Sequence, residues 1–185
     1  MNKLEKYFEA RPFIKTGDLL LYSGKSLISE GIKLVTDSEY SHIEMVLDFK
    51  DVFVLDRKFT IGALNRGIEI HSISSRVKNY EGKIDVYRCT KIEKAESIRL
   101  IREALKILDT PYGYDNIKDI VVDKLFKKKK YNPDDSPEQT EKFICSEAVS
   151  YLYRKIGIDL CPEKADEVTY PGDCIKNCTK IFNIL

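Results

Sequence analysis

The sequence lacks an excess of charge of either sign and has no long apolar run. Lysine and arginine number 31 and aspartate and glutamate number 30, which leaves a formal net charge of +1. A chain this close to neutral has no general basic surface, so we exclude non-specific nucleic-acid binding as its main task. No apolar stretch approaches the ~18 residues of a membrane-spanning helix, so we expect no stable membrane insertion.

The first residues also lack the features of an export signal. The stretch MNKLEKYFEARPF is charged and has no apolar core of the kind found in signal peptides. The sequence therefore predicts a cytoplasmic protein, or one that works in a host cytosol if its source is a phage or a virus.

Histidine is scarce, and the number of cysteines is odd. The chain has two histidines, His42 and His71, and five cysteines. Cys174 and Cys178 form a C-x3-C pair with no histidine nearby, so we expect no metal site and no organic cofactor. An odd number of cysteines without metal-binding spacing predicts free thiols and a reducing compartment.

The order of the expected elements indicates an α+β protein. Strands are expected over 17–23, 41–49, 51–59, 66–73, 83–90 and 180–184, and helices over 2–9, 26–36, 94–108, 114–126 and from Cys145 onward. Because the strands come first and the cysteine helix late, we expect an antiparallel sheet packed on helices, in a single domain over 1–185. The polar, proline-containing segment 127–142 predicts a mobile loop that gates the site.

A cysteine at the predicted start of a helix is the first candidate for chemistry. Cys145 opens the helix in FICSEAVSYLYRKIG, where free backbone N–H groups and the helix dipole stabilise a thiolate. A cysteine nucleophile also needs a base and a polar group that orients the base. His42 lies in a predicted strand and Asp56 in the next. A tight turn at Lys50 and Asp51 would form a hairpin in which a bulge or a two-residue shift brings Asp56 beside His42, with neighbouring Cβ atoms about 5 Å apart.

Six motifs in one order make the chain similar to a known family. They are GDLLLYSG, YSHIEMVL, VFVLD, LDTPYGYD, FICSEAVSYLY and TYPGDC. Together they resemble the NlpC-type papain-like cysteine hydrolases, in particular the circularly permuted branch with the YiiX-like proteins and the lecithin:retinol acyltransferase-like enzymes. The resemblance covers residues 16–178 and implies a permuted papain-like hydrolase domain, in which the histidine comes first and the cysteine last.

The resemblance also implies roles for single residues. Cys145 matches the nucleophile, His42 the general base and Asp56 the orienting group. Tyr112 matches a tyrosine that borders the site in the YiiX-like branch. We expect the Cys145 backbone N–H to stabilise the oxyanion, together with either Tyr112 or Tyr114.

Two positions depart from the family's pattern. Glu44 stands where the family commonly has glycine, and on a strand it points to the same face as His42. This predicts a preference for a substrate with a positive group, the alternative being a salt bridge from Glu44 to a neighbouring lysine or arginine. Asp56 is one methylene shorter than the glutamate often found at its position, so Glu69 and His71 stay open as orienting groups.

These residues predict a thiol hydrolase that cleaves an amide bond, in a peptide or an isopeptide, through a cysteine acyl-enzyme. One alternative is a lipid acyl hydrolase or acyltransferase, because the permuted branch also resembles phospholipid-processing enzymes. Another is a catalytically idle binding module of the same fold. The expected partner is therefore a peptide or other amide, with a cationic group near the scissile bond, and a lipid is the second choice.

Overall fold

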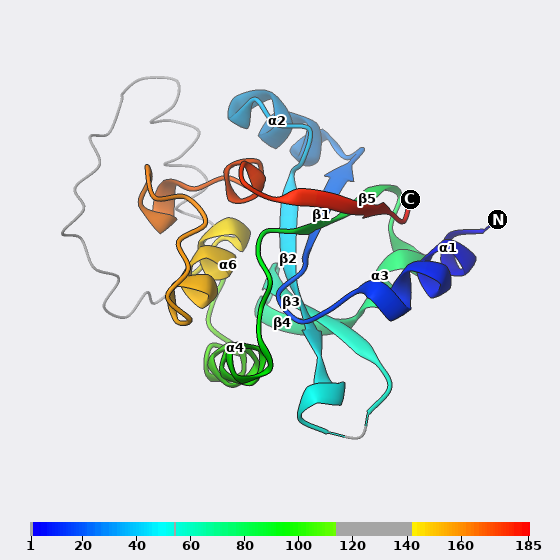
Figure 1. Ribbon diagram of the computed structural model, residues 1–185. Helices are drawn as coiled ribbons and strands as arrows, with labels where there is room; N and C mark the ends of the chain where they lie inside the picture. Colours follow the sequence, from blue (N-terminus) through cyan, green and yellow to red (C-terminus); the bar gives the residue numbers. More distant parts are fainter. Residues whose placement is uncertain (1, 54, 114–141) are drawn as a thin grey trace.

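Six antiparallel strands form one sheet in the computed structural model, which describes residues 2–53, 55–113 and 142–185 (Figure 1). The strands are β1 (Leu19–Gly24), β2 (His42–Asp48), β3 (Lys58–Leu64), β4 (Gly67–Ser72), β5 (Gly82–Arg88) and β6 (Thr179–Asn183). They lie in the order β4-β3-β2-β1-β5-β6, and every neighbouring pair is antiparallel. The predicted α+β class with an antiparallel sheet is confirmed.

Helices cover both faces of this sheet. They are α1 (Lys3–Ala10), α2 (Leu27–Thr36), α3 (Ile73–Asn79), α4 (Lys94–Lys106) and α6 (Cys145–Arg154). Helices α4 and α6 lie on one side of the sheet and α1 and α3 on the other, while α2 lies at one end (Figure 1). Within the described ranges, no helix has the length and apolar character needed to cross a membrane.

Alternation along β1 divides the apolar residues between two cores. Leu19 and Leu21 join the core under α4 and α6, whereas Leu20 and Tyr22 join the core under α1 and α3. Successive side chains of a strand point to opposite faces, and all four of these are buried. The run GDLLLYS is apolar without interruption because β1 is covered on both faces.

The connection between β2 and β3 differs from the predicted hairpin. The Asp48 carboxylate accepts a hydrogen bond from the backbone N–H of Lys50 at 3.2 Å, and the chain turns through a 3-10 helix at Phe49–Asp51. Such a side-chain bond two residues along competes with the strand ladder. Pairing resumes only at Lys58, opposite Asp48, so the prediction of a strand over 51–59 is wrong.

Most of the other expected elements are found close to their predicted positions. The helices expected over 2–9, 26–36 and 94–108 are confirmed as α1, α2 and α4. The expected helix over 114–126 lies outside the described residues, and so does the expected loop over 127–142 except for Lys142.

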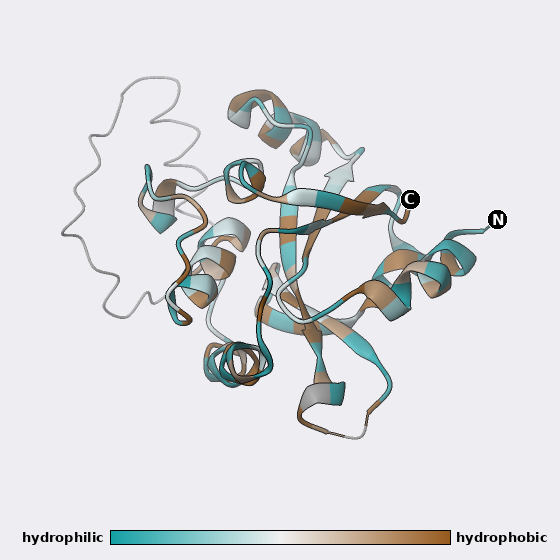
Figure 2. Ribbon diagram, in the orientation of Figure 1, coloured by the Kyte–Doolittle hydropathy of each residue, from teal (hydrophilic) through white to brown (hydrophobic). Residues whose placement is uncertain are grey.

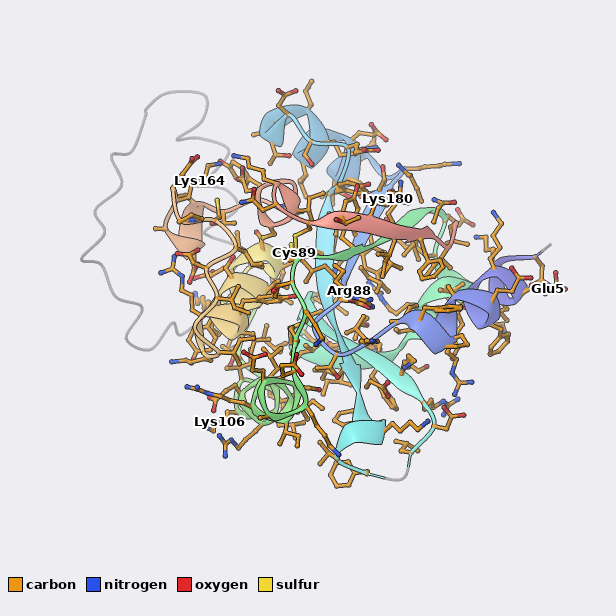
Figure 3. The ribbon with its side chains drawn as sticks, viewed as in Figure 1. Glu5, Arg88, Cys89, Lys106, Lys164 and Lys180 are labelled. Carbon is orange, nitrogen blue, oxygen red and sulfur yellow. A yellow bond between two sulfur atoms is a disulfide. The ribbon has the colours of Figure 1, made fainter. Side chains whose placement is uncertain are left out.

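The prediction that the cysteines are all free thiols is wrong. Cys89, which follows β5, forms a disulfide with Cys178, which precedes β6 (Figure 3). Cys145, Cys161 and Cys174 are free and buried. The two bonded residues are 89 positions apart, and only the pairing of β5 with β6 brings them together. The expectation of a reducing compartment, which rested on free thiols, therefore loses its premise.

Candidate active site

Cys145 is the first residue of α6, as predicted, and α6 packs on β2 and β3. The start of the helix is fixed by Glu147, whose carboxylate accepts a hydrogen bond from the backbone N–H of Ile144 at 3.1 Å. The backbone N–H groups of Ile43 and Ser146 donate to the Cys145 sulfur. The sulfur therefore lies where backbone dipoles stabilise a negative charge.

His42 is the first residue of β2, opposite Tyr22 of β1. Its Nε2 lies 3.1 Å from Oε1 of Glu44, and its ring also hydrogen-bonds the Cys145 sulfur. Because Nε2 faces the carboxylate, Nδ1 is the nitrogen left for the sulfur. The tertiary structure thus brings together the predicted cysteine and the predicted histidine.

Glu44 is the carboxylate that orients the imidazole. It lies two residues after His42 on the same face of β2, and its side chain is 1% exposed. Oε1 accepts hydrogen bonds from His42 and, at 2.5 Å, from Nη2 of Arg76. Oε2 accepts a hydrogen bond from the Tyr22 hydroxyl at 2.7 Å. Three partners therefore hold this carboxylate in one position.

Residues of β3 and α3 surround the Glu44 side chain. Gly62 of β3 provides room, because a Cβ at this position would lie 2.7 Å from the Glu44 Cγ. Arg76 comes from α3, and its Cζ lies 5.0 Å from the centroid of the Tyr22 ring. That ring lies 5.4 Å from the ring of His42. Tyr22, Arg76 and Gly62 thus set the position of the Glu44 carboxylate, which in turn orients the His42 ring.

The ionised forms of the three central groups support one another. Burial raises the pKa of Glu44, but His42 and Arg76 outweigh burial and lower this pKa to about 2. Burial lowers the pKa of His42, but the Cys145 thiolate and Glu44 raise it to about 9. Burial also raises the pKa of Cys145, and the imidazolium outweighs this and brings the pKa below its usual value. The lowered pKa of Cys145 and the raised pKa of His42 therefore both favour a thiolate–imidazolium pair.

Asp56 is not part of this site, so the prediction that it orients His42 is wrong. Its side chain is 85% exposed and pairs with Arg11 at 2.8 Å. The reason is the turn after β2, which delays pairing until Lys58 meets Asp48. Asp56 therefore lies beyond the end of β2 that is remote from His42.

Two other expectations about acidic residues are also settled by contacts. Oε2 of Glu69 lies 2.7 Å from Nε2 of His71 on the same strand, so neither residue orients His42. The expectation that Glu44 binds a cationic substrate is wrong, because this buried carboxylate already has Arg76 as its cation. The alternative of a salt bridge to a neighbouring arginine is the correct one.

A small cavity opens beside Cys145, with a volume of about 50 Å³. Ile32 and Val35 of α2 line it on one side, and Tyr112 lines it on another. Tyr112 is thus at the border of the site, where the family resemblance predicts it. Tyr114 lies outside the described residues, and the oxyanion role of either tyrosine stays a prediction.

Three supporting residues gave no clear signal in the sequence. Arg76 reaches the site only because α3 packs beside β3, and Tyr22 and Gly62 look like ordinary strand residues. The one usable signal was the two-residue spacing of His42 and Glu44, which puts both on one face of a strand.

The fold and the site together define an α+β protein with a cysteine at a helix start, a histidine at a strand end and a buried glutamate. No family model matches the chain, and no curated protein does. Among solved structures, it is similar to the metalloprotein YiiX from Escherichia coli O157:H7, a DUF1105 protein. The TM-score is 0.59 at 20% sequence identity, over 80% of this chain and 69% of the YiiX chain. The fold of this chain is therefore YiiX-like.

Proposed function

We propose that this protein is a thiol hydrolase of the permuted papain-like kind, which cleaves an amide bond through an acyl-enzyme on Cys145. The observation that carries the proposal is the continuous array from the Cys145 sulfur through the His42 ring to the buried Glu44 carboxylate. An activated nucleophile, a base in contact with it and a group that orients the base are what covalent catalysis requires.

In the proposed reaction, the Cys145 thiolate attacks the acyl carbon and forms a carbon–sulfur bond. The backbone N–H of Cys145 stabilises the oxyanion. The His42 imidazolium then gives its proton to the leaving amine, the carbon–nitrogen bond breaks, and a thioester remains. His42, now neutral, takes a proton from water as the oxygen attacks the thioester, and release of the acid restores the thiolate and the imidazolium. Glu44 keeps the ring in position and stabilises its charged form.

YiiX is a metalloprotein, but a metal ion enters no step of the reaction proposed for this chain. In residues 2–53, 55–113 and 142–185, no three His, Cys, Asp or Glu side chains are grouped so that they could hold a metal ion. The donor set of this described part of the chain does not fit a metal centre, whereas the charges of Cys145 and His42 fit a thiolate–imidazolium pair.

A lipid acyl ester is the second candidate substrate, and the cavity favours it. Ile32, Val35 and Ile144 line the cavity beside Cys145. Aliphatic side chains of this kind suit an acyl chain better than a charged peptide. The chemistry is the same, except that His42 protonates an alkoxide rather than an amine.

An acylation experiment tests the proposal. With 4-nitrophenyl butyrate, the wild-type protein should release a burst of nitrophenolate, and mass spectrometry should find a butyryl adduct on Cys145 that decays with time. Cys145→Ala should abolish the burst and the adduct. Cys161→Ala, a change at another buried free cysteine, should leave both in place. A wild-type protein that forms no adduct would instead be an idle binding module.

Amides and lipid esters with one common acyl chain then separate the two substrate classes. The proposal expects turnover of the amide, with the same adduct on Cys145. Turnover of the ester alone would retain the thiol chemistry and reassign the substrate to a lipid.

A further inference from the structure

Helix α2 is amphipathic, and its apolar side faces solvent. Leu27, Ile28 and Leu34 are 92%, 77% and 85% exposed. All of α2 is described, and none of its residues is buried. Figure 2 shows hydrophobic and hydrophilic colours side by side on α2, which lies at one end of the sheet in Figure 1. Helices in proteins are stabilised mainly by burial of their apolar side, and grouped exposed aliphatic residues mark a contact surface.

The apolar side of α2 continues into the cavity beside Cys145. At about 100° per residue, the apolar positions and the glycine follow one another around one side of the helix. In that order they are Leu34, Leu27, Gly31, Val35, Ile28 and Ile32. Val35 and Ile32 line the cavity, and a Cβ at Gly31 would have no described atom within 4 Å. One unbroken apolar surface therefore runs from solvent to the nucleophile.

The polar side of α2 indicates what kind of partner fits. Glu30 and Lys33 pair with each other at 2.7 Å, and Lys25 and Asp37 at the two ends balance in charge. The exposed residues are aliphatic, without the aromatic and arginine side chains that dominate protein–protein contacts. A neutral aliphatic surface beside an apolar cavity fits the acyl chains of lipids.

We propose that α2 is a docking helix that seats the protein on a membrane surface. The side chains of Leu27, Ile28 and Leu34 insert among the acyl chains, and the cavity beside Cys145 opens toward the lipid. The helix lies in the interface and does not span the bilayer. The inference concerns binding, so it holds whether or not Cys145 acts as a nucleophile.

Flotation with neutral phosphatidylcholine vesicles tests this proposal. The wild-type protein should float with the vesicles, and the double variant Leu27→Gln/Leu34→Gln should have a partition coefficient lower by roughly tenfold or more. Leu105→Gln is the matched control, because Leu105 is an exposed leucine on α4, and it should float like the wild type. Cys145→Ala should also float, which separates docking from the proposed chemistry.

Salt and stability measurements complete the test. Because the charges along α2 balance, raising the salt from about 0.05 to about 0.5 M should change binding less than about twofold. The proposal is overturned if wild-type protein does not float or if the double variant floats equally well. It is also overturned if the double variant melts more than about 4 °C below Leu105→Gln, since the leucines would then be buried within the chain. A wild-type dimer that the double variant turns into a monomer would assign the surface to a second copy and likewise overturn it.

Discussion

Replacing Glu44 with glutamine removes one charge from the site while it keeps the shape of the side chain. Two of the partners of this carboxylate, His42 and Arg76, are cations in the charged state of the site. We expect the pKa of His42 to fall from about 9 toward its ordinary 6.5. The pKa of Cys145 should rise, because its thiolate loses the support of the imidazolium. The pH range in which the ion pair exists therefore narrows from both ends.

The expected loss follows from the burial of Glu44. A hydrogen bond to a charged group contributes about 1.5–3 kcal/mol, and each 1.4 kcal/mol is about a factor of ten. The Glu44 side chain is 1% exposed, so water can neither screen nor replace the lost carboxylate. The rate at which Cys145 reacts with iodoacetamide near neutral pH should fall roughly ten- to hundredfold.

Peptide mapping after iodoacetamide labelling, repeated from about pH 4 to about pH 10, measures this effect. In the wild type, Cys145 should react faster than Cys161 under native conditions, and the acidic limb of its profile should move to higher pH in Glu44→Gln. Glu69→Gln is the matched control, because it makes the same change beside the other histidine at a similar distance. A Glu44→Gln profile that overlays the wild-type profile would refute the assignment of Glu44 as the orienting group.

Three further substitutions test the surroundings of the carboxylate. Gly62→Ala places a Cβ 2.7 Å from the Glu44 Cγ; urea unfolding should show a loss of about 1–3 kcal/mol, and labelling of Cys145 should slow. Arg76→Met removes the cation that helps to hold the pKa of Glu44 near 2, below its ordinary 4.5. Since stability from that shift is complete above about pH 4.5 and is lost toward pH 2, acid titration of unfolding should show a weaker pH dependence in this variant. Asp56→Asn changes an exposed residue outside the site, so labelling should match the wild type, and a slower rate would restore Asp56 as a candidate.

Local patterns in the sequence were enough for the fold class and for two of the three central residues. Apolar spacing located α1, α2 and α4, and the alternation of apolar residues located most strands. The cysteine at a helix start and the histidine in a strand were candidates on the same local grounds, and the order of six motifs that resemble a known family implied their roles. Such signals are readable from the chain because hydrophobic period and helix boundaries are local properties.

The identity of the residue that orients His42 depended on the tertiary structure. The sequence alone left Asp56 and Glu69 as candidate orienting groups. In the structure, the backbone N–H of Lys50 donates a hydrogen bond to Asp48, and the chain does not form the tight hairpin that would place Asp56 beside His42. The role of Glu44 then rests on Arg76, which comes from a helix 32 residues farther along the chain.

The disulfide between Cys89 and Cys178 has the same origin, since it joins residues 89 positions apart across the β5–β6 pair. Strand register, helix packing and cysteine pairing are set by contacts between distant segments. A short window of sequence holds only one side of each of these contacts, so the sequence determined the elements and the tertiary structure decided which of their side chains meet.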